Sequence, residues 1–280
     1  MIKLVAIDMD DTLLRKDKSF DKARFEKIYR SLQKEGIVLA IASGNPYPRL
    51  QEYLSFMEHE NIYIASDNGN YLVKGEELLT ENELKHKELI EVVEYLEAIG
   101  TFSIVFSDGK KTYSKWINSE YTDYIKSFNR HLNIISHLDE LQEKKIVKVA
   151  VHSELKLDDA KELVNQLMTQ FPNLAAVTSG GGWLDFYHRT GGKGSAIHAL
   201  QEKYQITHKE TMVFGDSLND ASMFEHANYS IVMGNGDEEL KEISNYEIGT
   251  NEDQAVLEIL ELFLKERSLS FLDQYKINRS

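Results

Sequence analysis

The sequence contains no cysteine, so this chain of 280 residues has no disulfide, no thiolate nucleophile and no cysteine-ligated zinc site. A reducing compartment is the easiest to reconcile with that absence, and we therefore expect a cytoplasmic protein. Long apolar runs are missing too, since no stretch reaches the roughly 18 apolar residues that a membrane-spanning helix needs. The chain starts with a charged, strand-like segment, so we expect no secretory signal.

Basic residues are few relative to acidic ones, with 32 against 46 and a formal net charge of −14. No basic stripe is present, so we expect no nucleic-acid partner. An acidic surface repels anionic substrates at long range, and a phosphate site in this chain must therefore supply its own local positive charge. The 42% of hydrophobic residues is enough for a packed core and too little for a membrane protein. The length predicts one large domain or two ordinary ones, and nothing in the sequence demands more than a monomer.

The first dozen residues form an apolar run that is followed by acidic residues. Residues 2–7 are typical of a strand buried on both faces, and Asp8, Asp10 and Asp11 follow it directly. Ligands of open α/β sheets bind outside the carboxyl ends of the strands. Two carboxylates at such an edge repel each other unless a proton or a cation intervenes, and a hard divalent ion such as Mg²⁺ suits oxygen ligands. The alternative for this stretch alone is a strand followed by an acidic turn.

Three later segments repeat this pattern of a buried strand followed by a small polar loop. Residues 37–42 lead into Ser43-Gly44-Asn45, and residues 211–214 lead into the loop 215–220. Residues 61–66 lead into a turn at 67–69, whose position also permits a role facing a substrate. Crossover helices are expected at 18–36 and 48–58, and Gly192-Lys193-Gly194 opens another at 196–204. A single doubly wound sheet explains these segments.

A different pattern separates the two parts of this sheet. From about residue 83 the strands alternate apolar and polar residues, as antiparallel strands with one exposed face do. Helices are expected at 89–99, 118–132 and 157–171, and strands at 102–107, 112–116, 145–152, 175–179 and 183–187, with a turn at 180–182. The sequence therefore predicts an α+β module at 83–188, inserted into a core made of residues 1–82 plus 189–280.

Four loops of the core would then meet at one edge of its sheet. They carry Asp8 with Asp10, Ser43 with Gly44, Lys193, and the acidic loop 215–220. Carboxylates can hold Mg²⁺, while a hydroxyl, a lysine and backbone N–H groups can hold phosphoryl oxygens. One aspartate would be left to attack phosphorus, which is a known covalent strategy. The combined set therefore predicts phosphoryl chemistry.

In their order and spacing, four motifs resemble those of the haloacid dehalogenase superfamily of phosphatases, specifically the Cof-type group with a large inserted (C2-type) cap. The motifs are Asp8-Met9-Asp10-Asp11-Thr12-Leu13, Ile41-Ala42-Ser43-Gly44-Asn45, Gly192-Lys193-Gly194 and Gly215-Asp216-Ser217-Leu218-Asn219-Asp220. The resemblance covers nearly the whole chain. It implies an α/β fold with a doubly wound, mainly parallel Rossmann-like core sheet and an inserted α+β cap. It also implies a Mg²⁺-dependent phosphatase of small phosphorylated metabolites, such as sugar phosphates or cofactor phosphates like flavin mononucleotide and pyridoxal phosphate.

The resemblance implies a role for each motif residue. Asp8 would be the nucleophile that becomes an aspartyl-phosphate, and Asp10 the general acid and base. Their separation by two residues would put both side chains on one side of the strand end. The implied Mg²⁺ ligands are the Asp8 carboxylate, the Asp10 backbone carbonyl, Asp216 and, as an additional candidate, Ser217, while Asp220 either supports the metal or holds Lys193. The implied phosphate-binding groups are the N–H groups of Met9 and Asp10, Ser43, the N–H of Gly44, Lys193 and Asn219.

Two other functions are compatible with the same residues. A phosphomutase or phosphotransferase would use the same phospho-aspartate and pass it to another hydroxyl. A non-catalytic phospho-acceptor domain of receiver type also has an acidic cluster and a lysine, but Asp10 and the inserted module argue against it. Asn45 stands where many Cof-type relatives have arginine, so one of their anion contacts is missing here, which points to a different substrate.

Overall fold

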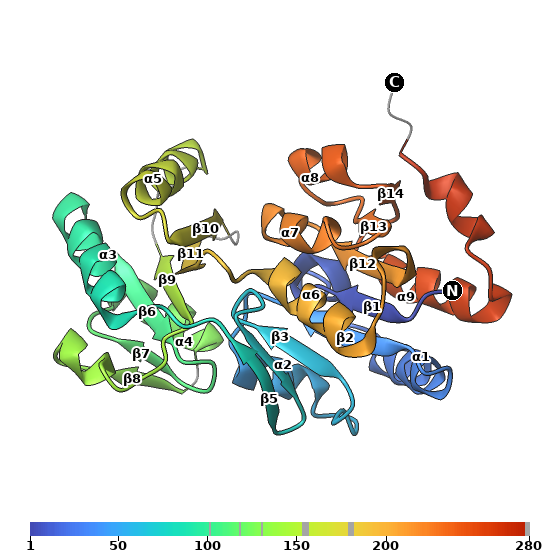
Figure 1. Cartoon of the computed structure of the whole chain (residues 1–280), viewed down its shortest axis with the longest axis horizontal. Coiled ribbons are helices and arrows are strands. Elements are labelled where there is room, and N and C mark those ends of the chain that lie inside the picture. The colour runs from blue at the N-terminus through green and yellow to red at the C-terminus, as the bar shows by residue number, and fades with distance from the viewer. Residues whose placement is uncertain (101, 118, 130, 153–156, 179–181, 278–280) are drawn as a thin grey trace.

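The computed structural model describes residues 1–280 except 101, 118, 130, 153–156, 179–181 and 278–280, and it contains two separate β-sheets. Figure 1 shows the sheets as two halves side by side. The chain passes between the halves twice, before α3 (His86–Ile99) and again before α6 (Lys193–Tyr204). No helix in the described part of the chain is both long enough and apolar enough to cross a membrane.

The larger sheet has eight strands in the order β14-β13-β12-β1-β2-β3-β4-β5. The pairings from β14 to β3 are parallel, and the hairpin β4–β5 adds two antiparallel strands at one edge. The expected doubly wound, mainly parallel sheet is therefore confirmed. Its strands are β1 (Leu4–Ile7), β2 (Val38–Ala42), β3 (Tyr63–Ser66), β4 (Tyr71–Lys74), β5 (Glu77–Glu81), β12 (Thr211–Gly215), β13 (Tyr229–Val232) and β14 (Tyr246–Glu247).

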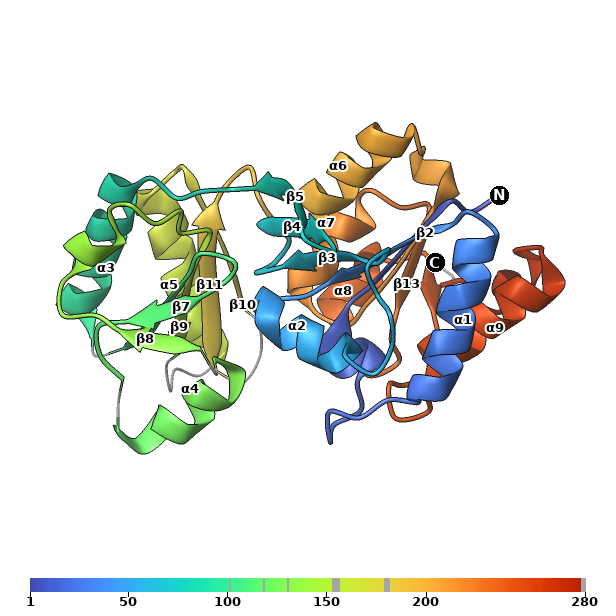
Figure 2. The same ribbon diagram turned by 90° about the horizontal axis from the view of Figure 1, so that it is seen from below.

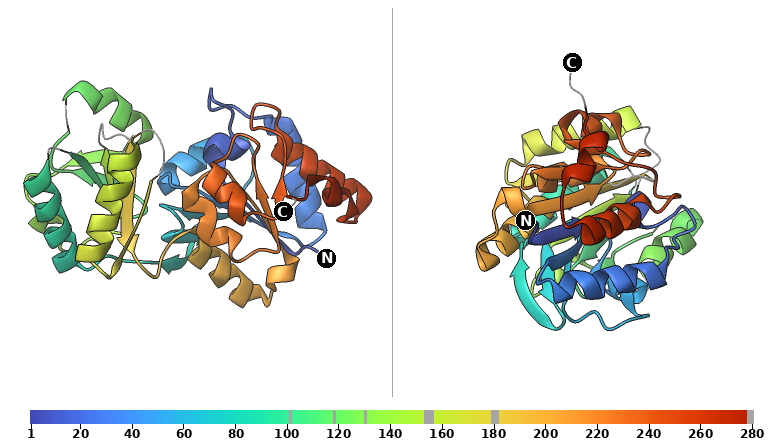
Figure 3. Two further views of the ribbon diagram at one scale, coloured as in Figure 1. Left: turned by 90° about the horizontal axis from the view of Figure 1, so that it is seen from above. Right: turned by 90° about the vertical axis from the view of Figure 1, so that its right-hand side faces the viewer.

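Helices cover both faces of this sheet because its strands are apolar on both faces. In β1, Val5 and Ile7 pack into one core, while Leu4 and Ala6 pack into the other. Figure 3 shows α1 and α9 close together on the first face. On that face lie α1 (Lys22–Lys34), α2 (Tyr47–Leu54) and α9 (Ala255–Glu266), and on the other α6, α7 (Ala221–Phe224) and α8 (Glu238–Ile243).

The smaller sheet has six strands in the order β10-β11-β9-β6-β7-β8, and Figure 2 shows it from below. Helices α3 and α5 (Leu157–Gln170) pack on one face around its own apolar core. On the other face, α4 (Thr122–Phe128) contributes Ile125 to a small cluster with Val105 and Ala150. The strands are β6 (Ser103–Ser107), β7 (Thr112–Ser114), β8 (Leu132–Ile134), β9 (Lys148–His152), β10 (Leu174–Thr178) and β11 (Trp183–His188).

One expected helix differs from the structure. The helix expected at 118–132 is only the seven residues of α4, and β8 follows it as an edge strand parallel to β7. Strand β8 has only three residues, two of them exposed, so the sequence shows no alternation of apolar and polar residues long enough to indicate a strand. Most of the turn expected at 180–182 lies outside the described residues. The last described residues pack against the larger sheet. Leu272 is fully buried, and Lys276 forms an isolated antiparallel β-bridge with Tyr246.

The carboxyl ends of the parallel strands face the smaller sheet. Asp8 follows β1, Ser43 follows β2, Asp67 follows β3, and Asp216 follows β12. Because these four strands are neighbours and parallel, their loops lie at one edge of the larger sheet. The fold therefore brings the motif loops together, as expected.

Candidate active site

A cavity of about 830 Å³ lies between the two sheets. Its walls come from both halves: the larger sheet contributes Asp8, Asp10, Ser43 and Asn219, and the smaller sheet contributes Lys148 among others. This volume is in the range of sites for small molecules, which is roughly 300–1,000 Å³. The cavity is therefore the candidate active site.

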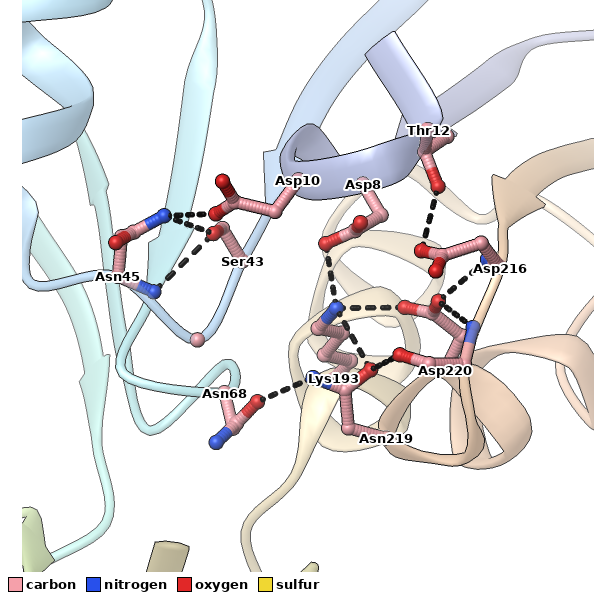
Figure 4. A network of polar contacts seen from close by, with 12 residues as sticks. Asp8, Asp10, Thr12, Ser43, Asn45, Asn68, Lys193, Asp216, Asn219 and Asp220 are labelled. Carbon is pink, nitrogen blue, oxygen red and sulfur yellow. Dashed lines mark hydrogen bonds and ion pairs between the residues drawn. The ribbon is translucent and has the colours of Figure 1, made fainter. Parts of the chain in front are cut away.

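Lys193 is fully buried beneath this cavity and joins two carboxylates. Its Nζ lies 2.6 Å from Oδ1 of Asp8 and 2.6 Å from Oδ1 of Asp220 (Figure 4). Burial alone would lower the pKa of Lys193, but Asp220 and Asp8 raise it above its ordinary value, so the ammonium stays charged. Burial raises the pKa of Asp8 to about 7, against the lowering effect of Lys193. Lys193 is thus a fixed positive charge beneath the cavity, of the kind that an acidic protein would need in order to hold an anion.

Asp8, Asp216 and Asp220 form an acidic group whose nearest oxygens lie within 4.8 Å of one another. Burial, followed by the charges of Asp8 and Asp220, raises the pKa of Asp216 well above its ordinary value. One lysine cannot balance three carboxylates, two of them buried. The donor set is all oxygen and carries excess negative charge, which fits a hard divalent cation such as Mg²⁺.

The three carboxylates are held differently. Thr12 Oγ1 donates to Oδ1 of Asp216 at 3.0 Å. Asp220 uses one oxygen for Lys193, and its Oδ2 accepts from the backbone N–H groups of Asp216 at 2.9 Å and Ser217 at 3.2 Å. Since its oxygens already have partners, Asp220 mainly holds Lys193 and the loop. Asp8 and Asp216 keep more of their oxygen lone pairs for a cation.

Asp10 lines the same cavity, but its carboxylate has other partners than that of Asp8. Its Oδ1 accepts from Lys18 Nζ at 2.7 Å, and its Oδ2 accepts from the side-chain amide of Asn45. Figure 4 shows it directed toward Asn45, while the carboxylate of Asp8 is directed toward Lys193. Strand alternation stops at Asp8, because residues 9–13 form a tight turn in which Asp11 has a φ of 57°.

The loop after β2 presents a hydroxyl and a glycine to the cavity. Ser43 Oγ accepts from the backbone N–H of Asn45 at 3.1 Å and from its side-chain amide at 3.2 Å, which leaves its own hydrogen for a ligand. The backbone N–H of Ser43 donates to Ala65 O at 2.9 Å, so strand pairing uses that donor. The carbonyl of Gly44 accepts from Lys148 Nζ.

The other expected phosphate-binding residues surround Lys193. Asn219 Oδ1 accepts from Ser217 Oγ at 2.9 Å and lies 3.4 Å from Lys193 Nζ. Its Nδ2 donates to Oδ1 of Asn68 at 3.2 Å. The Met9 side chain is fully buried in the hydrophobic core, so only its backbone can serve a ligand.

Sequence reasoning missed Lys18 and Lys148 at this site, and it singled out Asn45 without foreseeing its contact with Asp10. Lys18 and Asn45 hold Asp10, and Lys148 reaches the Ser43-Gly44 loop from the smaller sheet. A signal existed for Lys148, since it is a lysine within an otherwise apolar strand pattern. No local sequence pattern indicates a role for Lys18, because the turn of residues 9–13 determines that it meets Asp10.

Comparisons with known proteins agree on one family. A family model described as haloacid dehalogenase-like hydrolase matches residues 5–260. A 5-amino-6-(5-phospho-D-ribitylamino)uracil phosphatase of Escherichia coli is 26% identical, with 95% of this chain and 98% of that protein covered. An HMP-PP phosphatase of Yersinia enterocolitica is 27% identical, covering 98% of this chain and all of that protein. A crystal structure from Streptococcus mutans superposes with a TM-score of 0.88 at 25% identity, over 95% of this chain and 100% of that one.

Proposed function

The chain belongs to the haloacid dehalogenase-like hydrolases and is a phosphatase, and from this premise we propose that it hydrolyses small phosphate monoesters through a phosphoryl group carried on Asp8. The resemblance inferred from the four motifs is thereby confirmed at the level of the family. The observation that carries the proposal is the buried Lys193, which lies 2.6 Å from Asp8 under a cavity of substrate size. The carboxylate is held by a fixed positive charge where a phosphoryl group would arrive.

In the first step, an Asp8 oxygen attacks phosphorus and the bond from phosphorus to the ester oxygen breaks. The carboxylic acid of Asp10 gives its proton to the departing oxygen, so the product is a neutral alcohol. In the second step, the Asp10 carboxylate takes a proton from water, the resulting hydroxide attacks phosphorus, and Asp8 leaves as a carboxylate. Lys18 and Asn45 orient Asp10 for both transfers.

Positive charge and a hydroxyl donor around the phosphoryl group complete the site. Lys193 balances charge on Asp8, and the Ser43 hydroxyl can donate to a phosphoryl oxygen. Asp8, Asp216, the Asp10 carbonyl and the Ser217 hydroxyl would hold Mg²⁺, which when bound neutralises negative charge on the carboxylates and the phosphoryl oxygens. We assign Asp220 to Lys193 and the loop because its oxygens have those partners.

Residues 83–188 would act as a cap that chooses the substrate, over a catalytic core of residues 1–82 plus 189–280. The cavity supports this division, because its wall opposite Asp8 comes from the smaller sheet. One relative is named for a phosphorylated ribitylamino-uracil, which is a metabolite with a polyol chain and a ring. Cofactor phosphates and sugar phosphates are therefore the classes to screen first.

The test is phosphate release from p-nitrophenyl phosphate by the wild type, Asp8→Asn and Asp10→Asn, with the exposed Asp17→Asn as control. We expect Asp8→Asn to abolish activity, Asp10→Asn to reduce it by about 10²–10⁴-fold, and Asp17→Asn to leave it unchanged. Chelation with EDTA should inactivate the enzyme, and added Mg²⁺ should restore it. Near-normal activity of Asp8→Asn would remove Asp8 as the nucleophile. Release of p-nitrophenol without matching phosphate would favour a phosphotransferase instead.

A further inference from the structure

A chain of hydrogen bonds connects the smaller sheet with Lys193, and it begins at Asp185 of β11. Oδ2 of Asp185 accepts from the side-chain amide of Asn68 at 2.7 Å. Oδ1 of Asn68 in turn accepts from Nδ2 of Asn219 at 3.2 Å, and Oδ1 of Asn219 lies 3.4 Å from Nζ of Lys193 (Figure 4). Two amides thus join a carboxylate of the smaller sheet to the lysine that faces Asp8.

The members of this chain are enclosed, and their places are fixed. Asn68, Asp185 and Asn219 are all buried. The backbone N–H of Asn68 donates to Ser43 O at 2.9 Å, which anchors the turn after β3 to the loop after β2. Gly44 packs against the pair, since a Cβ added there would lie 3.3 Å from Oδ1 of Asn68 and 3.5 Å from Oδ2 of Asp185. Amides buried in this way need partners among the groups around them.

The two ends of the chain require the same orientation of both amides. A carboxylate only accepts hydrogen bonds, an ammonium only donates them, and an amide has one end for each. Asn68 therefore turns its NH₂ group to Asp185, which leaves its oxygen for Asn219. Asn219 turns its own NH₂ group to Asn68, and its oxygen then faces the Lys193 ammonium.

Lys148 holds the carboxylate at the start of the chain. Its Nζ lies 3.5 Å from Oδ2 of Asp185 and 3.4 Å from Oδ1 of Asp67, and it donates to the carbonyl of Gly44. Burial alone would lower the pKa of Lys148, but Asp185 and Asp67 raise it above its ordinary value, so the ammonium stays charged. Oδ2 of Asp185 thus lies between two donors, the Lys148 ammonium and the Asn68 amide.

At the other end, Asn219 supplies a third acceptor for Lys193. An ammonium has three N–H groups, and Asp8 and Asp220 accept two of them at 2.6 Å each. An Asn219 amide turned the other way would set two donors face to face and displace the ammonium from its place beside Asp8. The position of this charge matters, because electrostatic stabilisation of a phosphoryl group depends on charges that are in place before the reaction.

We propose that Asp185 is a positioning residue for phosphoryl transfer, which acts through Asn68 and Asn219 to hold Lys193 in the catalytic arrangement. Asp185 and Lys148 belong to the smaller sheet, so the arrangement is complete only while the two sheets are in contact. This inference rests on the proposed phosphatase function and adds to it: the smaller sheet contributes to the rate of the reaction as well as to the choice of substrate.

The first test is Asp185→Ala, which removes the acceptor and lets the Asn68 amide turn either way. The Lys148 ammonium keeps its two other acceptors. We expect kcat to fall by about 10-fold with KM within about twofold of the wild type, because the placement of Lys193 changes while the phosphate ligands remain. The loss should be equal for p-nitrophenyl phosphate and glycerol 2-phosphate, since the leaving alcohol is not involved. Asp139→Ala, at an exposed carboxylate of the smaller half, is the control.

The second test adds Asn68→Asp to this variant. A carboxylate at position 68 only accepts, so it holds the NH₂ group of Asn219 without help from Asp185. Residue 68 has a φ of 57°, which aspartate tolerates. In Asn68→Asp/Asp185→Ala we expect kcat to return to within about threefold of the wild type. The double variant still lacks the hydrogen bond between the two sheets, so a purely structural contact would stay lost, and urea unfolding measures that loss.

An unchanged kcat in Asp185→Ala, or a loss confined to KM or to the free energy of unfolding, would overturn the inference and leave Asp185 as a contact between the sheets. A double variant no more active than Asp185→Ala would contradict the role of Asn68. If Asp185→Ala does not fold, Asp185→Ser takes its place, because a hydroxyl both donates and accepts and so does not fix the direction of the bond. A wild type inactive on both esters would instead contradict the phosphatase function itself.

Discussion

The side-chain amide of Asn45 donates a hydrogen bond to Oδ2 of Asp10, and so joins the loop after β2 to the loop after β1. Lys18 holds the other oxygen of the same carboxylate at 2.7 Å. The proposed proton donor therefore has both oxygens fixed by side chains that play no direct part in the bond changes. Where many Cof-type relatives have an arginine, this chain uses an amide for positioning.

Asn45→Ala should lower kcat by about 10- to 100-fold while KM changes little, because Asp10 loses an orienting contact and no expected phosphate ligand is removed. Steady-state kinetics with p-nitrophenyl phosphate measures both constants. Asn61→Ala, at an exposed asparagine, is the matched control and should behave like the wild type. A rise in KM with unchanged kcat would mean that Asn45 binds the phosphate rather than positions Asp10.

Lys193→Met should lower kcat/KM by at least about 10³-fold, because the variant keeps the shape but loses the charge that faces Asp8 and Asp220. It should also destabilise the protein by about 3–5 kcal/mol at neutral pH, since two buried carboxylates lose their partner. Urea unfolding measures the second effect. Lys203→Met, at an exposed lysine of the same helix, is the control. Retention of a tenth of the activity would contradict the role of Lys193.

Mg²⁺ affinity should rise with pH between about 6 and 8. Burial raises the pKa of Asp8 to about 7 and that of Asp216 well above its ordinary value, so in the metal-free protein Asp8 is protonated below about pH 7 and Asp216 keeps its proton to higher pH than an ordinary carboxyl does. A divalent cation needs the ionised carboxylates, and each group still protonated weakens binding up to about tenfold per pH unit. Calorimetric titration at pH 6, 7 and 8, in buffers of different ionisation enthalpy, measures the dissociation constant and the protons released. An affinity independent of pH would show that these carboxyls are already ionised.

Gly69→Ala should impair catalysis from a distance. Gly69 has a φ of +79°, and an added Cβ would lie 2.6 Å from Gly192 O and 2.8 Å from Lys193 Cα. The start of α6 must then shift, and Lys193 with it, so we expect at least a tenfold loss of kcat/KM and about 1–3 kcal/mol of destabilisation. Gly75→Ala is the matched control, because Gly75 also has a positive φ but its nearest atom lies at 3.5 Å. Equal activity losses in the two variants would point to backbone strain and away from Lys193.

Much of the core could be predicted from the sequence because the signals are local. The buried run of β1 and the polar residues after β1, β2 and β12 are visible one segment at a time. Neighbouring parallel strands end at the same edge, so the meeting of Asp8, Ser43 and Asp216 follows from the topology. The helix expected at 118–132 was wrong because a three-residue edge strand has no period long enough to compete.

The sequence by itself determined the family, the doubly wound core and the residues that could carry phosphoryl chemistry. Only the tertiary structure decided what each carboxylate faces: Lys193 for Asp8, Asn45 and Lys18 for Asp10, and the loop backbone for Asp220. It also decided that Lys148 meets Asp67 beside the cavity. Periodicity shows which face of an element is buried, but the partner of each side chain is chosen by tertiary packing, which no local pattern records.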